Sequence, residues 1–186
     1  SGPKDLTLVV VDGERKGFSR GQNFHKIGMK AQDTSELFFD NECVPAENLL
    51  GVAAMENRGF ICLMEQLPWE RMQIAIGAIA KTQSIIDHTI AYVRERKVFG
   101  NAVASFQNTR FKLAEMQSQV QMARVFVDHC MVLLLAGELD APTASMAKLN
   151  CTDMAGKVID ECLQLHGGYG YMWEYPIARA YADTRV

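Results

Sequence analysis

The pattern of hydrophobic and polar residues changes near Leu50, and after about Met55 it becomes helical. From there on, apolar residues recur at alternating steps of three and four, which is the period of a helix that buries one face. Three such stripes predict three long helices. They are Ile76, Ile79, Gln83, Ile86, Ile90 and Val93; Leu113, Met116, Val120, Ala123, Val127, Cys130 and Leu134; and Ala147, Cys151, Met154, Val158, Cys162 and Leu165.

The ends of these helices indicate how they are arranged. Asp140 with Pro142 is a typical helix start, and the pair Gly167–Gly168 is a typical stop. The links at 97–106 and 136–142 are short, so consecutive helices should be antiparallel neighbours in an up-down bundle. Apolar residues in the run 131–136 extend beyond the second stripe, which predicts burial on more than one side, against another subunit.

The residues before Leu50 read as short strands joined by loops. We predict one strand at Leu6–Val11 and a second within "SELFFDNECVP", residues 35–45, ended by Pro45. About fifty residues with so few strands make a poor independent domain. The segment should therefore be part of a sheet whose other strands lie elsewhere.

Composition and charge narrow the class of protein. The 186 residues are 48% hydrophobic with a net charge of −3, and the absence of a long basic stripe argues against nucleic acid as a partner. The apolar runs are too interrupted to predict a membrane span, and the first residues predict no targeting segment. Five cysteines without a CxxC pair predict small buried hydrophobes in a reducing compartment.

Metal and hydrolase chemistry find no support in the sequence. None of the four histidines follows a glutamate by three residues, as a di-iron bundle site requires, and no HExxH occurs. We therefore predict no metal. A serine hydrolase is also disfavoured, because no GxSxG turn is present.

Three segments each allow a structural and a functional reading. In "RERKVFGN", residues 94–101, Gly100 can cap a helix, or Arg96 can contact a phosphate beside the aromatic face of Phe99. In "QLHGGYGYMWEYP", residues 164–176, the glycines can end a helix or admit a ligand close to the backbone, and the aromatic residues after them are most simply packing.

The third segment is "QLPWERMQIA", residues 66–75. Pro68 and Glu70 suit the first turn of a helix, where a carboxylate interacts favourably with the helix dipole. The functional reading is a carboxylate placed as a base. Taken alone, the residues leave both readings open.

Taken in order, these segments resemble the acyl-CoA dehydrogenase family, most closely its long-chain type. The resemblance also includes "KIGMKAQDTSELFFDNECVPAENLLG", residues 26–51, and it covers the whole chain. It implies a mainly α fold. Residues 53–186 would form the family's C-terminal up-down four-helix bundle, truncated at its end. Residues 1–52 would be the latter part of the central β domain, a fragment of a barrel-like sheet.

The activity implied by the resemblance is FAD-dependent α,β-dehydrogenation of a fatty acyl-CoA to the trans-2-enoyl-CoA, as in fatty acid β-oxidation. A carboxylate removes the α-proton, hydride passes to flavin N5, and electrons leave to electron-transfer flavoprotein. Glu70 in "PWER" matches the base of the long-chain and isovaleryl types, and Glu65 is a weaker candidate. By the same match Pro68 and Trp69 line the acyl site, and Arg71 contacts the CoA portion.

The resemblance also implies an FAD site shared between subunits. Arg96 would reach the pyrophosphate, with Phe99 nearby, and Phe106 and Gln107 would face the adenosine end. The backbone bordering the adenosine diphosphate portion would be that of Gln164, Leu165, His166, Gly167 and Gly168. In the family these groups reach FAD held mainly by a neighbouring subunit, so a homo-oligomer, typically a tetramer, is expected.

The sequence departs from the family pattern at two places, and two other functions stay open. Ala182-Asp183-Thr184 replaces the usual Arg-Asp-Ala, which affects a local ion pair, and the bulky Trp69 could reshape the acyl pocket. Alternatives are an acyl-CoA oxidase-like flavoprotein and a catalytically silent helical interaction module. The isolated chain is expected to be inactive. The expected location is the bacterial cytoplasm or the mitochondrial matrix.

Overall fold

The computed structural model describes residues 6–51 and 53–186, and they divide into two compact units. The first contains the described residues up to Leu67, and the second is Pro68–Val186. The boundary between them falls inside helix α1, Gly59–Glu95, at the proline within that helix. The domain boundary at residues 52/53 stays a prediction.

The first unit is held together by short antiparallel pairings. Strand β1, Phe18–Arg20, pairs with β2, Leu37–Phe39, with Phe18 opposite Phe39. Two short 3-10 helices, η1 at Ala46–Asn48 and η2 at Ala53–Met55, lead toward α1. The strand expected within residues 35–45 is confirmed as β2, which is shorter than the segment, whereas β1 is an element that the sequence did not reveal.

The strand predicted at Leu6–Val11 is wrong. Only a single bridge forms there, between Val9 and Leu49, and it is flanked by hydrogen bonds from Val10 N–H to Asn48 O at 2.9 Å and from Leu50 N–H to Leu8 O at 2.9 Å. The facing segment turns into η1 immediately before Leu49, so no longer ladder can grow. A β-rich sequence without a regular neighbouring strand stays irregular.

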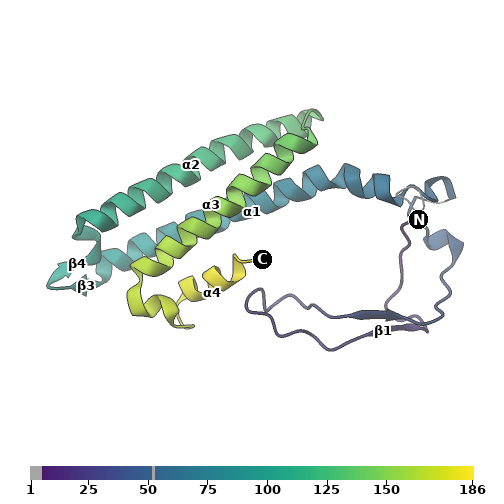
Figure 1. Ribbon diagram of the computed structural model, residues 1–186, viewed down its shortest axis with the longest axis horizontal. Coiled ribbons are helices and arrows are strands. Elements are labelled where there is room, and N and C mark those ends of the chain that lie inside the picture. The colour runs from purple at the N-terminus through teal and green to yellow at the C-terminus, as the bar shows by residue number, and fades with distance from the viewer. Residues whose placement is uncertain (1–5, 52) are drawn as a thin grey trace. The chain divides into compact units, whose positions relative to one another are not determined.

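The second unit is helical (Figure 1). After α1, a small hairpin of β3, Lys97–Val98, and β4, Asn101–Ala102, leads through the 3-10 helix η3, Val103–Ser105, into α2, Gln107–Ala136. Then come α3, Ala141–Leu165, the 3-10 helix η4, Gly167–Tyr171, and the short α4, Pro176–Asp183. The mainly helical fold is confirmed as three long helices and one short one.

The predicted helix termini and stripes are largely confirmed. Asp140 is the N-cap of α3, and its carboxylate accepts a hydrogen bond from Thr143 N–H at 2.7 Å. The three stripes meet in one core, where the side chains of Ile79, Val120 and Val158 are almost fully buried. A reciprocal pair of amide hydrogen bonds between Gln83 and Gln117 joins α1 to α2. The cysteines of the stripes, Cys130, Cys151 and Cys162, are buried as expected, whereas Cys43 is exposed and Cys62 is half-buried, contrary to the prediction.

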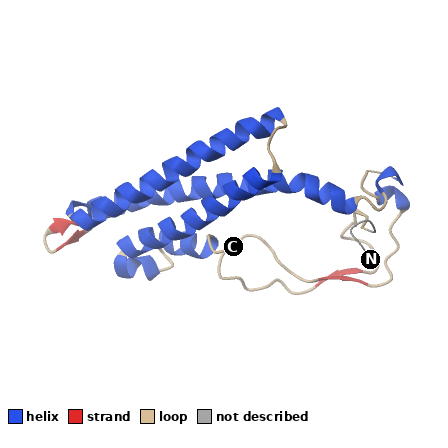
Figure 2. Cartoon of the chain, turned by 45° about the horizontal axis from the view of Figure 1, so that its top comes forward, coloured by secondary structure: helices blue, strands red, loops and turns tan. Residues whose placement is uncertain are grey.

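Two expectations about helix ends are wrong. Helix α1 begins at Gly59, so Pro68 lies inside it and Glu70 stands eleven residues beyond its start. The apolar residues before Pro68 extend the helix backward, and proline is tolerated in a helix interior at the cost of one hydrogen bond and a local kink. Gly100 does not cap α1; it lies in the two-residue turn of the β3–β4 hairpin. Figure 2 shows this hairpin in red at the end of the helical bundle.

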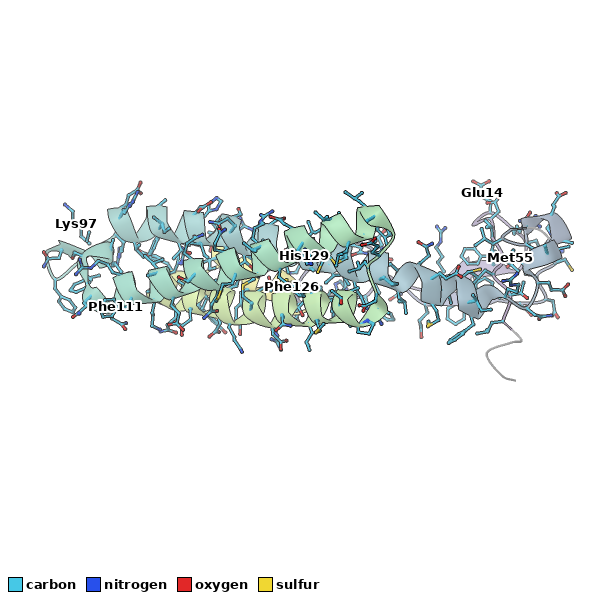
Figure 3. The ribbon with its side chains drawn as sticks, turned by 90° about the horizontal axis from the view of Figure 1, so that it is seen from above. Glu14, Met55, Lys97, Phe111, Phe126 and His129 are labelled. Atoms are coloured by element: carbon cyan, nitrogen blue, oxygen red, sulfur yellow. The ribbon has the colours of Figure 1, made fainter. Side chains whose placement is uncertain are left out.

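Helix α2 leaves much apolar surface exposed. Figure 3 shows its side chains along the bundle, with Phe111 toward the hairpin end and Phe126 and His129 further along. The exposed apolar side chains of α2 include Phe111, Met122, Val125, Val132 and Leu135. By length and composition α2 is, among the described residues, the one helix long and apolar enough to cross a membrane. One such helix is weak evidence, because the core helix of a soluble protein can pass the same test.

Candidate functional site

Arg96 stands at the point where α1 gives way to the hairpin. Its backbone N–H continues the helix by donating to Tyr92 O at 2.9 Å, and its carbonyl accepts from Val103 N–H at 2.8 Å. Helix α1 therefore holds the N–H side of the Arg96 backbone, and the start of η3 holds its carbonyl side. The guanidinium lies over the ring of Tyr169, 5.1 Å from the ring centroid. Arg96 remains exposed, so the charge faces outward from a fixed backbone.

The segment Gln164–Gly168 follows from the way α3 ends. His166 is the C-cap, and Gly167 adopts the left-handed conformation with a φ of 59°, as is common after a helix C-terminus. The predicted stop at the glycine pair is thus confirmed. A Cβ atom placed on Gly167 or on Gly168 would meet no other atom within 4 Å, so the space over this backbone is open.

Arg96 and the Gln164–Gly168 segment line one pocket, which we call the Arg96 pocket. It has a volume of about 500 Å³. Its lining residues are Tyr92, Arg96, Val98, Val103, Gln164, Leu165, His166, Gly167, Gly168, Tyr169 and Met172. Residues almost seventy positions apart in sequence are therefore brought together as the functional reading requires, with one positive charge beside an open glycine backbone.

The buried wall of the pocket contains a neutral histidine. His166 is 7% exposed, and burial lowers the pKa of its imidazole below the ordinary value. Its Nδ1 lies 2.8 Å from Cys162 O. A carbonyl oxygen only accepts, so Nδ1 carries the proton and Nε2 is free to accept. Sequence reasoning missed Tyr92, which stacks on this ring at 4.2 Å; its position four residues before Arg96 was the available signal.

The other predicted cofactor residues do not line the Arg96 pocket. Phe99 stands at the tip of the hairpin, 94% exposed and with a left-handed φ of 50°. Phe106 and Gln107 stand at the start of α2, where Phe106 is the N-cap and makes no side-chain capping bond. Their roles stay predictions, because a shared site would place their partners on another subunit.

The predicted substrate residues and the predicted base lie at residues 68–71. This is where the second unit begins, in the part of α1 that is far along the helix from Arg96. Glu70 and Trp69 are exposed, whereas Pro68 and Arg71 are half-buried. Met72, two residues beyond Glu70, is fully buried, so Glu70 lies on the side of the helix away from the core. Within the described residues no hydrogen bond or ion pair holds the Glu70 carboxylate.

The face that carries Glu70 also carries Gln73, Ile74 and Gly77, at helical spacings of three, four and seven. Ile74 is 48% exposed, and a Cβ on Gly77 would meet nothing within 4 Å. This face thus offers a free carboxylate next to exposed apolar and small residues. A flat apolar ligand could lie against it with its reactive atoms at the carboxylate.

Other chemistries have less support in the described part of the chain. The thiols of Cys151 and Cys162 have pKa values raised to about 11 by burial, so they stay protonated and are poor nucleophiles. Among the described residues, no group of three or more histidine, cysteine, aspartate or glutamate side chains is placed to hold a metal ion. The features that remain are a carboxylate on an exposed helix face and a cationic pocket.

Gly170 packs closely against Leu163 and His166, and replacing it should be costly. A Cβ at this position would lie 2.5 Å from Leu163 O and 3.1 Å from Leu163 Cγ. We expect Gly170→Ala to lower the free energy of unfolding by about 1–3 kcal/mol, as overpacking does. Gly156→Ala is the matched control: Gly156 lies inside α3 with nothing within 4 Å of the added Cβ. It should raise stability by about 1 kcal/mol. Urea denaturation measures both, and equal effects would contradict the packing described.

A family model and a known relative both match most of this chain. The family model described as "Acyl-CoA dehydrogenase, C-terminal domain" matches residues 57–186. The mitochondrial long-chain specific acyl-CoA dehydrogenase of Rattus norvegicus is 48% identical over 181 residues, which is 97% of this chain and 41% of that protein. The chain thus spans about two fifths of the length of this relative.

Solved structures agree with the sequence comparison. An acyl-CoA dehydrogenase from Geobacillus kaustophilus superposes with a TM-score of 0.93 at 44% identity, covering 98% of this chain and 47% of that one. A glutaryl-CoA dehydrogenase from Mycobacterium smegmatis, solved in complex with FADH2, gives a TM-score of 0.89 at 27% identity, covering 98% of this chain and 46% of that one.

Proposed function

The chain belongs to the acyl-CoA dehydrogenase family, and on this basis we propose that the protein oxidises a fatty acyl-CoA thioester to the trans-2-enoyl-CoA. The observation that carries the proposal is the pairing of two features on one helix. A free carboxylate, Glu70, lies in the first half of α1, and a cationic pocket with an open glycine backbone lies at Arg96, just past the end of that helix.

FAD fits the Arg96 pocket by the chemistry of its lining. The Arg96 guanidinium suits a diphosphate, because its planar donors match phosphate oxygens. The Gly167–Gly168 backbone has open space above it, where a side chain would otherwise intrude on a ligand. Apolar side chains such as Val98 and Val103 suit the flat surface of a nucleoside. FAD, when bound, supplies the hydride acceptor of the reaction.

Glu70 is the proposed base that removes the α-proton of the thioester. An α-proton is weakly acidic, so the base must be held close to it and be strong enough to take it. A carboxylate in water is a weak base, and excluding water strengthens it. In the described structure Glu70 is exposed, so the water must be excluded by the acyl chain and the cofactor themselves.

The length of α1 favours a site built from two subunits. Glu70 and Arg96 are 26 residues apart, which corresponds to about 39 Å along a helix. That is more than the diameter of a small domain and beyond the reach of one flavin dinucleotide. The two residues of one chain therefore serve different cofactor molecules, and we propose a homo-oligomer, typically a tetramer. The exposed apolar side chains of α2 supply a surface for such an assembly.

The remaining proposals follow from the family and its members. Electrons would leave to electron-transfer flavoprotein, and the pathway would be fatty acid β-oxidation, in keeping with the similarity to a long-chain enzyme. Because relatives include mitochondrial and bacterial proteins, we propose the mitochondrial matrix or the bacterial cytoplasm as the location.

Anaerobic titration of the full-length protein with acyl-CoAs of graded length tests this function. We expect the flavin absorbance to bleach on addition of substrate and to return with electron-transfer flavoprotein. Hydrogen peroxide production at a comparable rate in air would favour the oxidase-like alternative. A full-length protein without bound flavin would contradict the proposal and favour a silent interaction module.

A further inference from the structure

The wall of the Arg96 pocket contains most of a cluster of rings that the proposed reaction does not use. Tyr92 stacks on His166 with centroids 4.2 Å apart and meets Tyr175 edge-on at 6.2 Å. Tyr175 stacks in turn on Tyr169 at 5.0 Å, and Tyr169 lies under the guanidinium of Arg96. The cluster links three separate segments: the end of α1, the turn after α3 and the start of α4.

Tyr92 makes a hydrogen bond in addition to its ring contacts. Its hydroxyl donates to His166 O at 3.1 Å, and this carbonyl immediately precedes Gly167. Burial raises the pKa of Tyr92 above its ordinary value, and the nearby Arg96 opposes that rise more weakly. The hydroxyl therefore stays protonated and remains a donor. The imidazole beneath it is held by Cys162 O, so both the ring and the carbonyl of His166 are fixed.

We infer that Tyr92 is a positioning residue of the dinucleotide site, which holds the Gln164–Gly168 backbone at a set distance from Arg96. The inference rests on the proposed function. Tyr92 lies in the last turn of α1, and Arg96 directly follows that helix with its N–H bonded to Tyr92 O. This continued helical hydrogen bond connects the residue that holds the glycine turn to the residue proposed to bind phosphate.

The two parts of the Tyr92 side chain should have separable effects. The ring packs against His166 and Tyr175 and so contributes to folding, as partly buried aromatic residues commonly do. The hydroxyl contributes little to packing but fixes one carbonyl beside the glycine turn. Removing the hydroxyl alone should therefore weaken cofactor binding while leaving the fold intact.

The test uses the full-length apoprotein with Tyr92→Phe and, as a matched control, Tyr181→Phe. Tyr181 is a partly exposed tyrosine on α4 that does not line the Arg96 pocket. A hydrogen bond between neutral groups is worth about 0.5–1.5 kcal/mol, so we expect the Tyr92→Phe variant to bind FAD roughly threefold to tenfold more weakly. Quenching of flavin fluorescence on binding gives the dissociation constant.

Two further measurements separate positioning from mere packing. The melting temperature of the Tyr92→Phe apoprotein should fall only slightly, by the loss of one hydrogen bond, and at saturating FAD its KM for acyl-CoA should be unchanged. Tyr92→Leu, which also removes the ring, should lower the melting temperature as well as FAD affinity. Equal FAD dissociation constants for wild type and Tyr92→Phe would overturn the inference. Failure of the wild type to bind FAD would instead overturn the proposed function.

Discussion

Glu70→Gln is expected to leave FAD and acyl-CoA binding intact and to slow flavin reduction by roughly 10²- to 10⁴-fold, the usual contribution of a general base. Glutamine keeps the size and polarity of the side chain but cannot accept the α-proton. The exposed position of Glu70 favours this clean outcome, since no described hydrogen bond or ion pair is lost with the charge. Anaerobic stopped-flow measurement of the flavin absorbance gives the rate.

Glu65→Gln is the matched control for the base. Glu65 is also an exposed glutamate of α1, five residues earlier, and was the weaker candidate from the sequence. Its replacement should leave the reduction rate unchanged. A Glu70→Gln variant that reduces its flavin at the wild-type rate would show that Glu70 is not the base. If Glu65→Gln were then inactive, the base would be Glu65.

Arg96→Gln should weaken FAD binding by roughly 10- to 100-fold, because a hydrogen bond to a charged group contributes about 1.5–3 kcal/mol. The substitution removes the positive charge of the guanidinium and also its planar set of N–H donors, which matches the oxygens of a diphosphate. The guanidinium is exposed and covers only the face of Tyr169, so the loss should fall on binding rather than on folding. Fluorescence titration of the apoprotein measures the affinity.

Arg94→Gln provides the control for position. Arg94 is an exposed arginine in the last turn of α1, two residues earlier, so it projects from a different side of the helix. It does not line the Arg96 pocket. Its replacement should leave FAD affinity within about twofold, while equal losses for both variants would indicate a general electrostatic effect and not a specific contact.

The helical part of the fold could be predicted because its signals are local and repeated. The three stripes place a core residue every three or four positions, and every apolar member was found buried or packed against the core, whereas Gln83 is half-buried and hydrogen-bonds to Gln117. The start of α3 at Asp140 and its end before Gly167 depend on capping chemistry within a few residues. Local rules of this kind act whatever the rest of the molecule does.

The strands and the start of α1 could not be predicted with the same success. Pairing of Phe18 with Phe39 joins residues 21 positions apart, and neither strand is long enough to show an alternating pattern. Pro68 looked like a helix start because proline favours the first turn, yet here it lies inside α1. Sequence alone could not decide between these two positions.

The candidate site was predictable as a set of segments but not as an arrangement. Arg96 and the Gln164–Gly168 turn were each ambiguous alone, and only the fold brings them to one pocket. The contribution of Tyr92 was hidden, because a tyrosine in a helical stripe region reads as packing. Only the structure shows that its hydroxyl donates a hydrogen bond to His166 O, at 3.1 Å.

The span of α1 has a genetic consequence. If Glu70 and Arg96 of one chain serve different cofactors, two alleles that are each inactive can complement one another. A mixed oligomer of one chain altered at Glu70 and another altered at Arg96 would contain one intact site for each doubly damaged one. Alleles altered at the same end of the helix would gain nothing from mixing. We therefore expect inheritance of such defects to depend on which end of the helix each allele affects.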